Sequence, residues 1–439
     1  MLMQKKMTSL RTSFALASAL FASTAAFAQT VSVSNEAELK TALSNTSADI
    51  VLTQDITLSG EWIPIGTKEA PYMGTFDGQG HAIKGLTITT KADNLGFFSF
   101  IGSTATVKNV SFTGAKVLGN KQAAIVAGQA ENATISNVYV SGYVTGCDHV
   151  GTIVGDARGD ANVDTDGTNI SNCVSTAAAL SSDNQAGGIA GWTNLGMFEY
   201  NVAYGAVTAP NGGAAGICSM IDNNGHASFI GNVSAMPYAK GGNNRTSGIL
   251  GWKNGSGCAI VDDDQNLSSD ATQYFVGGNL TAAADIKFDE NNDGINGIVT
   301  PAADLKKAAT YTTAGFSADV WNLVDGQYPT LKTQAAIENA IYTAQAPSRY
   351  VVGTEYDTQA SSTLGSAVTI TSSDPSVVAV EGTTLKFEAQ GDAVVTFTAA
   401  ATDVAPAFTT TLPITVGDIN YAITTPADLM AVKYNMAGN

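Results

Sequence analysis

Two short motifs alternate along most of this chain, and their repetition constrains the fold more than any other feature. The first is a small residue followed by two apolar residues, with central residues Phe97, Ile125, Ile153, Ile189, Ile217 and Ile249. These lie 28, 28, 36, 28 and 32 positions apart. The second motif is Asn followed by an apolar residue or Cys, and it begins at positions 109, 137, 172, 201, 232 and 266, at least 12 positions after the first. A constant minimum spacing with occasional additions predicts one repeated coil that carries inserted loops.

Each motif lies in a short run of β-branched and apolar residues, such as 106–112, that glycines and asparagines interrupt. One such unit is too small to enclose a core. Stacked about 4.8 Å apart, however, the units bury a continuous one. The sequence therefore predicts an all-β fold whose main domain, residues 29–334, is a right-handed parallel β-helix.

Stacking predicts that equivalent residues form columns, and two columns are apolar throughout. We expect both to face the core. The first holds Phe98, Val126, Val154, Ala190, Cys218 and Leu250, and the second holds Val110, Val138, Cys173, Val202, Val233 and Leu267. Cys173 and Cys218 then act as small buried hydrophobic residues, whereas the sequence does not decide between thiol and disulfide for Cys147 and Cys258. The Asn residues of the second motif are expected to be structural, since each amide can bond to its copy one coil away.

The N-terminal residues 1–28 have the features of a signal peptide. Lys5, Lys6 and Arg11 precede an apolar run at 14–27, and small residues at 26 and 28 form a cleavage site before Gln29. Residues 34–43 follow as a short amphipathic helix with Ser34 or Asn35 as N-cap, which we expect to cap the first coil.

The charge balance limits the choice of partners. The formal net charge is −17, and the signal peptide carries three positive charges, so the mature chain has −17 − 3 = −20. This acidity argues against nucleic acid and anionic membranes as partners. It permits neutral sugars, proteins and divalent cations. No later stretch is long and apolar enough to insert into a membrane.

Three stretches carry a resemblance to a known family: Trp62 to Gly66, Gly74 to Leu86, and Asn94 to Phe98. They resemble the opening of GLUG-motif β-helix proteins, which are common in Bacteroidetes and in some adhesin-like surface proteins. Trp321 to Leu331 looks like the usual end of such a helix. The resemblance implies a protein exposed at the cell surface, and it carries no catalytic residues over. We expect this secreted protein to bind a host or dietary glycan or a surface protein.

Residues 335–418 lose the coil pattern and show alternating strands instead. Thr371 to Val380 and Gly391 to Ala399 resemble a bacterial Ig-like domain, a common spacer in surface proteins. Residues 419–439 repeat the pattern of the capping helix, so we expect them to be the start of a further, truncated β-helix unit.

One candidate binding site is a column three residues after the centre of each first motif. It holds Phe100, Gly128, Asp156, Trp192, Met220 and Trp252. If the column faces solvent, Trp192, Met220 and Trp252 form an apolar strip suited to sugar rings or to a protein partner. The alternative is that these side chains close over the edge of the core.

A candidate calcium loop lies at Asp289, Asn291 and Asp293, whose oxygen ligands alternate before Gly294. The twelfth position is Thr300, so the bidentate glutamate of such loops is missing. Calcium is the one cofactor that the sequence offers, and no other is expected.

A polysaccharide lyase or glycoside hydrolase is the alternative function, because some β-helices are enzymes. Such enzymes need clustered carboxylates with an acid or base from neighbouring coils. Here Asp156 stands alone in its column, and the three histidines, His81, His149 and His226, occupy unrelated coil positions. The sequence therefore favours a non-catalytic adhesion or binding protein, with a purely structural spacer as a third hypothesis.

Overall fold

The structure is a computed structural model of the chain. It describes residues 30–159, 167–237, 239–242, 245–254, 259–260, 276–277, 297–301 and 303–417. The expected signal peptide, Cys258, Leu267, the candidate calcium loop and the segment 419–439 therefore lie outside the described residues.

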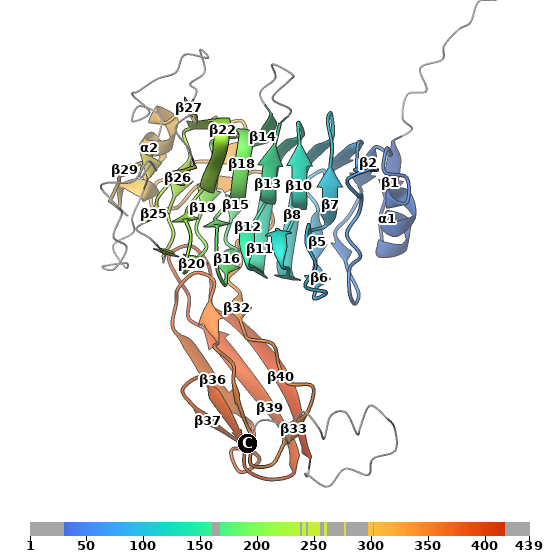
Figure 1. The fold of residues 1–439 in the computed structure, drawn as a ribbon. Helices are drawn as coiled ribbons and strands as arrows, with labels where there is room; N and C mark the ends of the chain where they lie inside the picture. The colour runs from blue at the N-terminus through green and yellow to red at the C-terminus, as the bar shows by residue number, and fades with distance from the viewer. Residues whose placement is uncertain are drawn as a thin grey trace, which may run out of the picture.

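The main body is a parallel β-helix of about seven turns, as the sequence predicted. Its coils stack along one axis from α1 (Glu36–Leu43) to β29 (Ile298–Val299), as Figure 1 shows. One sheet runs through β7 (Phe98–Ile101), β10 (Ala127–Glu131), β13 (Val154–Arg158), β18 (Ala190–Glu199), β22 (Cys218–Ile230) and β26 (Leu250–Lys253). A second sheet joins β9 (Lys121–Ala123), β12 (Asp148–Gly151), β17 (Ala186–Gly187), β21 (Ala214–Ala215) and β25 (Thr246–Ser247). The remaining side is formed by the long strands β8 (Thr106–Leu118) and β11 (Thr134–Gly146) and by the shorter strands that continue them.

Helix α1 caps the first coil, as expected from the sequence. The Asn35 side chain accepts a hydrogen bond from the Glu38 amide at 3.0 Å, and the Glu38 carboxylate accepts one from the Ser34 amide at 2.8 Å. These reciprocal bonds satisfy donors that the first helical turn leaves unpaired. Leu39 and Leu43 are buried against the strands β1 (Val31–Val33) and β2 (Ile50–Leu52). The first coil therefore does not present an open apolar end.

The first core column differs from the prediction by one residue. Strand pairing places Ala127, not Val126, between Phe98 and Val154. The Val126 carbonyl accepts from the Phe98 amide, while the next amide, that of Ala127, donates to the following coil. This coil thus holds one additional residue. Both side chains are fully buried, so the column stays apolar although the predicted member was wrong.

The second core column is correct for its first members and wrong for its later ones. Each coil turns at a residue with left-handed backbone, which is Asn109, Asn137 or Asn172 in three coils but Tyr200 and Gly231 in the next two. The motif asparagines of these two coils, Asn201 and Asn232, therefore lie one residue beyond the turn. Because strand side chains alternate between faces, this offset sends Val202 and Val233 outward. They pair in one row with Val174, while Cys173 stays in the core.

Hydrogen bonds confirm the structural role of the asparagines. The Asn137 side chain donates to Asn109 at 3.0 Å, and Asn109 donates to Asp77 at 3.1 Å. In later coils, Asn201 donates to Asn232 at 2.9 Å. These are two separate ladders rather than one, because of the same one-residue offset.

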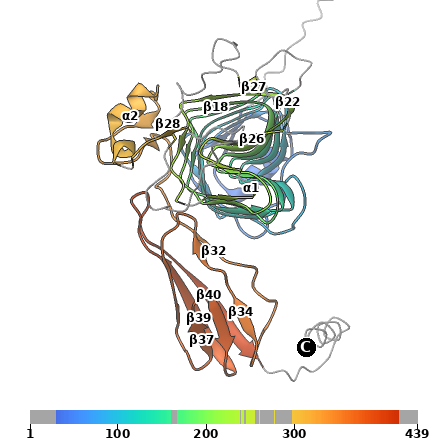
Figure 2. The same cartoon turned by 60° about the vertical axis from the view of Figure 1, so that its left-hand side comes forward.

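An outer apolar stripe lies on the flank of the β-helix, formed by Tyr139, Val174, Val202 and Val233. Residues 303–331 cover it with η2 (Asp304–Lys306), α2 (Ala308–Thr313), β30 (Trp321–Asn322) and β31 (Thr330–Leu331). Figure 2 shows α2 outside the coils. The Trp321 indole donates to Asn172 at 3.0 Å. The segment expected to end the helix therefore lies along its side.

The chain then forms a small β-sandwich. One sheet contains β33 (Tyr350–Val351), β40 (Phe408–Gly417), β39 (Gly391–Ala399) and β36 (Val368–Ser372), and the other contains β34 (Glu355–Asp357), β38 (Thr384–Phe387) and β37 (Val378–Glu381). Glu338 joins it to the β-helix. Its amide donates to the Tyr139 hydroxyl at 2.8 Å, and its carbonyl accepts from Thr176 at 3.0 Å. The sandwich therefore attaches to the flank of the helix rather than continuing its axis (Figure 1).

Candidate binding face

Two rows of outward-facing residues lie side by side along the β-helix, and we call them together the binding face. Row A comes from the sheet of β7 to β26, and row B from the sheet of β9 to β25. Row A holds Phe100, Gln129, Asp156, Trp192, Met220 and Trp252. Row B holds Asn94, Gln122, His149, Gln185, Gly213 and Arg245. Gln129 replaces the expected Gly128 in row A because of the additional residue in that coil.

Glycines bring the two rows together. Gly128, Gly155 and Gly191 each precede a row A residue, and the backbone of row B crosses directly over them. A β-carbon at Gly191 would lie 2.3 Å from the carbonyl carbon of His149, and one at Gly128 would lie 2.4 Å from that of Asn94. Such distances exclude any side chain at these positions. The glycine pattern of the sequence thus sets the distance between the rows.

The predicted residues Trp192, Met220 and Trp252 do lie in one row, but two of them are covered. Trp192 is 6% exposed and Met220 is 5% exposed, whereas Trp252 is half-buried. The Gln185 amide contacts the Met220 sulfur at 3.5 Å, and the Arg245 guanidinium lies 3.5 Å from the Trp252 ring centroid. A partner approaching this row first meets amides and cations held over the rings.

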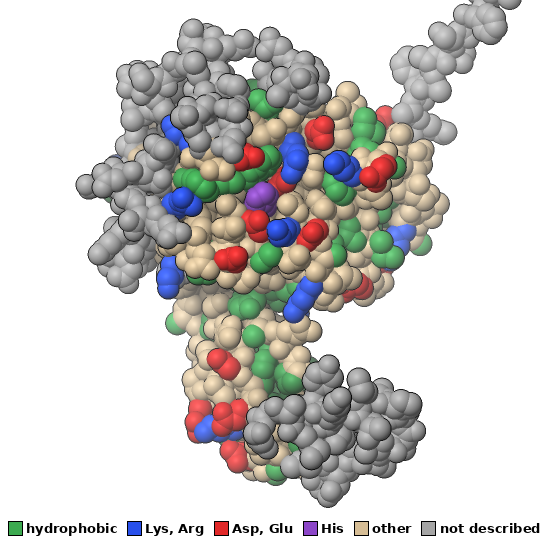
Figure 3. All heavy atoms as spheres, in the orientation of Figure 1, with side chains coloured by type: hydrophobic (Ala, Val, Ile, Leu, Met, Phe, Trp, Pro, Cys, Tyr) green, Lys and Arg blue, Asp and Glu red, His purple; other side chains and the backbone are tan. Residues whose placement is uncertain are grey.

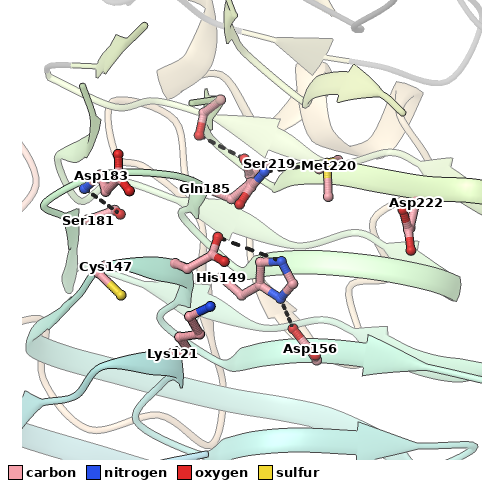
Figure 4. Close-up of polar contacts among 12 residues, drawn as sticks. Lys121, Cys147, His149, Asp156, Ser181, Asp183, Gln185, Ser219, Met220 and Asp222 are labelled. Carbon is pink, nitrogen blue, oxygen red and sulfur yellow. Dashed lines mark hydrogen bonds and ion pairs between the residues drawn. The ribbon is translucent and has the colours of Figure 1, made fainter. Parts of the chain in front are cut away.

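Trp192 has the most elaborate cover. The His149 ring stacks on it with centroids 5.5 Å apart and planes 11° apart, and the Arg158 guanidinium lies 4.9 Å from its centroid. Figure 4 shows the contact between His149 and Asp156, with Met220 on β22, two strands away from the strand of Asp156. Figure 3 shows acidic and basic side chains interspersed over this side of the molecule.

A charged cluster lies under this cover. Asp156 is fully buried and bonds to His149 Nδ1 and to Arg158 Nη2, both at 2.6 Å. Asp148 Oδ1 lies 3.7 Å from the other ring nitrogen of His149. Burial lowers the pKa of His149, but the hydrogen bond and charge of Asp156, together with Asp148, outweigh it and raise the pKa above its ordinary value. The cluster therefore favours a protonated imidazole between two carboxylates.

This arrangement is better suited to holding a surface together than to abstracting a proton. A histidine whose pKa is raised is protonated over a wider pH range and is then unable to act as a base. The Ser219 hydroxyl of β22 donates to the Gly213 carbonyl at 2.7 Å. Burial, followed by the charge of Asp148, raises the pKa of the Cys147 thiol. Among the described residues, no three His, Cys, Asp or Glu side chains converge as metal ligands.

The sequence did not reveal this cluster. It treated Asp156 as alone in its column and His149 as unrelated to the other histidines. The two residues are seven positions apart and lie on different sheets, so neither the coil period nor the strand alternation relates them. The small residues at 155 and 191, where the backbones cross, were the available signal.

At the end of row A nearest the N-terminus lies a cleft of about 240 Å³ that three successive coils line. Phe100 and Gln129 contribute from row A, and Lys68, Pro71 and Met73 from the preceding coil. The sequence did not predict this cleft, because the loop at 66–71 lies before the first copy of either motif.

Comparisons with known proteins support the fold and a short local relationship. No family model matches the chain. A crystal structure of a protein described as a candidate immunoglobulin A1 protease from Bacteroides ovatus superposes with a TM-score of 0.53 at 20% identity, covering 70% of this chain and 93% of that one. At this identity, the likeness shows the fold alone.

The other similarity is to halomucin from Haloquadratum walsbyi, with 36% identity over 104 residues. The match covers 24% of this chain and 1% of halomucin, so the chain corresponds to a very small part of that relative. Among the described residues, no helix has the length and apolar character needed to span a membrane.

Proposed function

We propose that this protein is exported to the cell surface and binds glycans through the binding face without transforming them. The observation that carries the proposal is the layered construction of this face, in which aromatic and thioether side chains in register lie beneath amides and guanidinium groups. Such a surface offers apolar contact and hydrogen-bond donors at the same place.

The shape of the face favours an extended ligand. Six coils contribute to row A, and successive strands lie about 4.8 Å apart, so the row extends over about 24 Å. Hydroxyl groups of a neutral glycan can donate to the carboxylates of this side and accept from its cations. The overall acidity of the chain weakens binding of acidic polymers. The predicted signal peptide and the local likeness to halomucin support an extracellular location.

A polysaccharide-cleaving enzyme is the second candidate, and the charged cluster of His149, Asp156 and Arg158 favours it. A cation beside a buried carboxylate can stabilise charge that develops during cleavage of a sugar polymer. The raised pKa of His149 disfavours a general base, so we rank this function below binding.

A glycan array with the full mature chain tests the proposal. It is run with calcium and with chelator, and each hit is assayed for reaction products. We expect binding without product, and the exchange Trp252→Ala with Arg245→Ala should weaken it at least tenfold. The control Lys386→Ala removes a cation from the β-sandwich and should bind normally.

Product release would favour the enzyme. Unchanged affinity of the double variant would contradict the assignment of the face. Loss of binding on chelation would support the predicted calcium loop at Asp289, Asn291 and Asp293.

A further inference from the structure

The cleft at the N-terminal end of row A has the features of a preformed binding site. Its volume of about 240 Å³ lies below the range of about 300–1,000 Å³ typical of sites for drug-sized molecules. A ligand of one small ring fits such a space. The cleft lies in line with row A, since Phe100 and Gln129 belong to both.

Backbone hydrogen bonds fix the walls of the cleft. The Tyr72 amide donates to the Phe100 carbonyl, and the Gly102 amide donates to the Tyr72 carbonyl, both at 2.9 Å. The loop above closes through the Thr67 amide, which donates to Ala70 at 3.1 Å. Pro71 and Met73 pack over Gly102, where a β-carbon would lie 2.6 Å from the Met73 sulfur. The apolar wall is therefore already in place without a ligand.

Gln129 supplies the observation that indicates a polar ligand. Its side chain lines the cleft and is only 8% exposed, yet it forms no side-chain hydrogen bond with any residue that the structure describes. Neither of its amide atoms is fully enclosed by protein, so both can bond to a group that enters the cleft. The Gln129 amide offers two donors and an acceptor at the same point. A ligand with neighbouring hydroxyl groups satisfies both functions.

The other walls complete a site for a sugar. The half-buried Phe100 ring and the partly exposed Met73 provide an apolar surface for the C–H face of a pyranose. Lys68 and Glu131 lie at the rim, and neither forms an ion pair within the described part of the chain. Together they offer a donor and an acceptor of opposite charge, which both suit the hydroxyl groups of a neutral sugar, whereas a carboxylate attracted by Lys68 is repelled by Glu131.

We infer that this cleft binds a single neutral pyranose ring, with its apolar face on Phe100 and Met73 and its hydroxyls on Gln129, Lys68 and Glu131. The inference rests on the proposed function and refines it. The glycan end enters the cleft, and the rest of the polymer lies along row A. A single ring gives weak affinity, and the contacts along the row add to it.

Saturation-transfer NMR on the full mature chain tests this inference. The probes are methyl β-glucoside, methyl β-galactoside, methyl α-mannoside and, as the acidic comparison, methyl glucuronide. At least one neutral glycoside should bind, and Gln129→Met and Phe100→Ala should each weaken it at least tenfold. Gln129→Met preserves side-chain length and apolar packing, so its effect reports the lost hydrogen bonds. The control Glu69→Ala changes a charged residue of the same loop that does not line the cleft and should bind normally.

Each alternative result has a distinct meaning. If no neutral glycoside binds, if the glucuronide binds better than all of them, or if Gln129→Met binds normally, the sugar assignment of the cleft is wrong. Glycan-array binding that still depends on Trp252 and Arg245 would then leave the proposed function standing. Absence of array binding by the wild-type protein would refute the proposed function itself. Saturation-transfer NMR measures binding of a neutral glycoside to the cleft independently of the array.

Discussion

Replacement of Asp156 by Asn tests whether the charged cluster holds the binding face together. Asp156 is fully buried, and its carboxylate accepts bonds from His149 at 2.6 Å and from Arg158 at 2.6 and 3.2 Å. Asparagine has nearly the same shape, so packing is preserved. Its amide, however, carries no charge. The NH2 group of the amide would face the N–H donor of one of the two partners, where no hydrogen bond can form. We therefore expect the variant to fold with a lower free energy of unfolding.

The magnitude follows from the bonds to these two partners. A hydrogen bond to a charged group contributes about 1.5–3 kcal/mol. Arg158 is 37% exposed, and solvent screening reduces its share. His149 is 16% exposed and retains most of its own. The loss should therefore be about 2–4 kcal/mol, which corresponds to roughly 4–8 °C in the melting temperature of the β-helix.

The effect should depend on pH in a defined direction. The pKa of His149 is raised in the folded protein above its unfolded value of about 6.5. The stabilisation is therefore complete below pH 6.5 and is lost as the pH rises through the folded pKa. In Asp156→Asn the principal cause of the raised pKa is absent. The difference in stability between wild type and variant should thus be larger at pH 6 than at pH 9.

Urea unfolding at pH 6 and pH 9, followed by circular dichroism, measures both quantities. Asp183→Asn is the control, because Asp183 is an exposed carboxylate of the same side whose bond to Asn211 is also exposed. It should change the unfolding free energy by about 0.5 kcal/mol or less. If Asp156→Asn costs no more than this control, or if the two proteins show the same pH dependence, then the cluster does not stabilise the face as argued.

Three further predictions concern the fold. Gly191→Ala should cost at least about 2 kcal/mol of stability in thermal unfolding, because its β-carbon would lie 2.3 Å from the backbone of row B. Tyr139→Phe removes the acceptor of the linker amide, so limited proteolysis should cut at 335–345 faster than in wild type. Burial raises the pKa of Cys173 and of Cys218 to about 12. Iodoacetamide at pH 8 should therefore modify the half-buried Cys147 before either of them, and mass spectrometry would detect the opposite order.

The repeat period was sufficient to predict the β-helix and most of its core. The spacing of the first motif placed Phe98, Val154, Ala190, Cys218 and Leu250 in one column, because each coil must return to the same point before stacking. It could not show that Ala127 rather than Val126 belongs to this column. One additional residue inside a coil leaves the spacing between motifs unchanged when a later turn is shorter by one residue.

The candidate site was predictable only as a row. The period related Trp192, Met220 and Trp252, but it contained no information on what covers them. His149 and Gln185 reach the row from a different sheet through turns whose geometry depends on glycines. The cleft at Gln129 depends on an inserted loop as well. Contacts between sheets thus require the three-dimensional path of the chain, which a one-dimensional period does not contain.

The one-residue offset of the turn before Asn201 and Asn232 explains where the β-sandwich attaches. Once Tyr200 and Gly231 take over the left-handed turn from asparagine, Val202 and Val233 point outward beside Val174. A row of exposed valines on the flank would be costly, at about 25 cal/mol for each Å² of apolar surface left in water. Residues 303–331 cover this row, and the chain that leaves them must continue from the flank. The lateral position of the sandwich therefore follows from a register change in two coils, and it leaves the binding face and its cleft on a different side of the helix from the attachment.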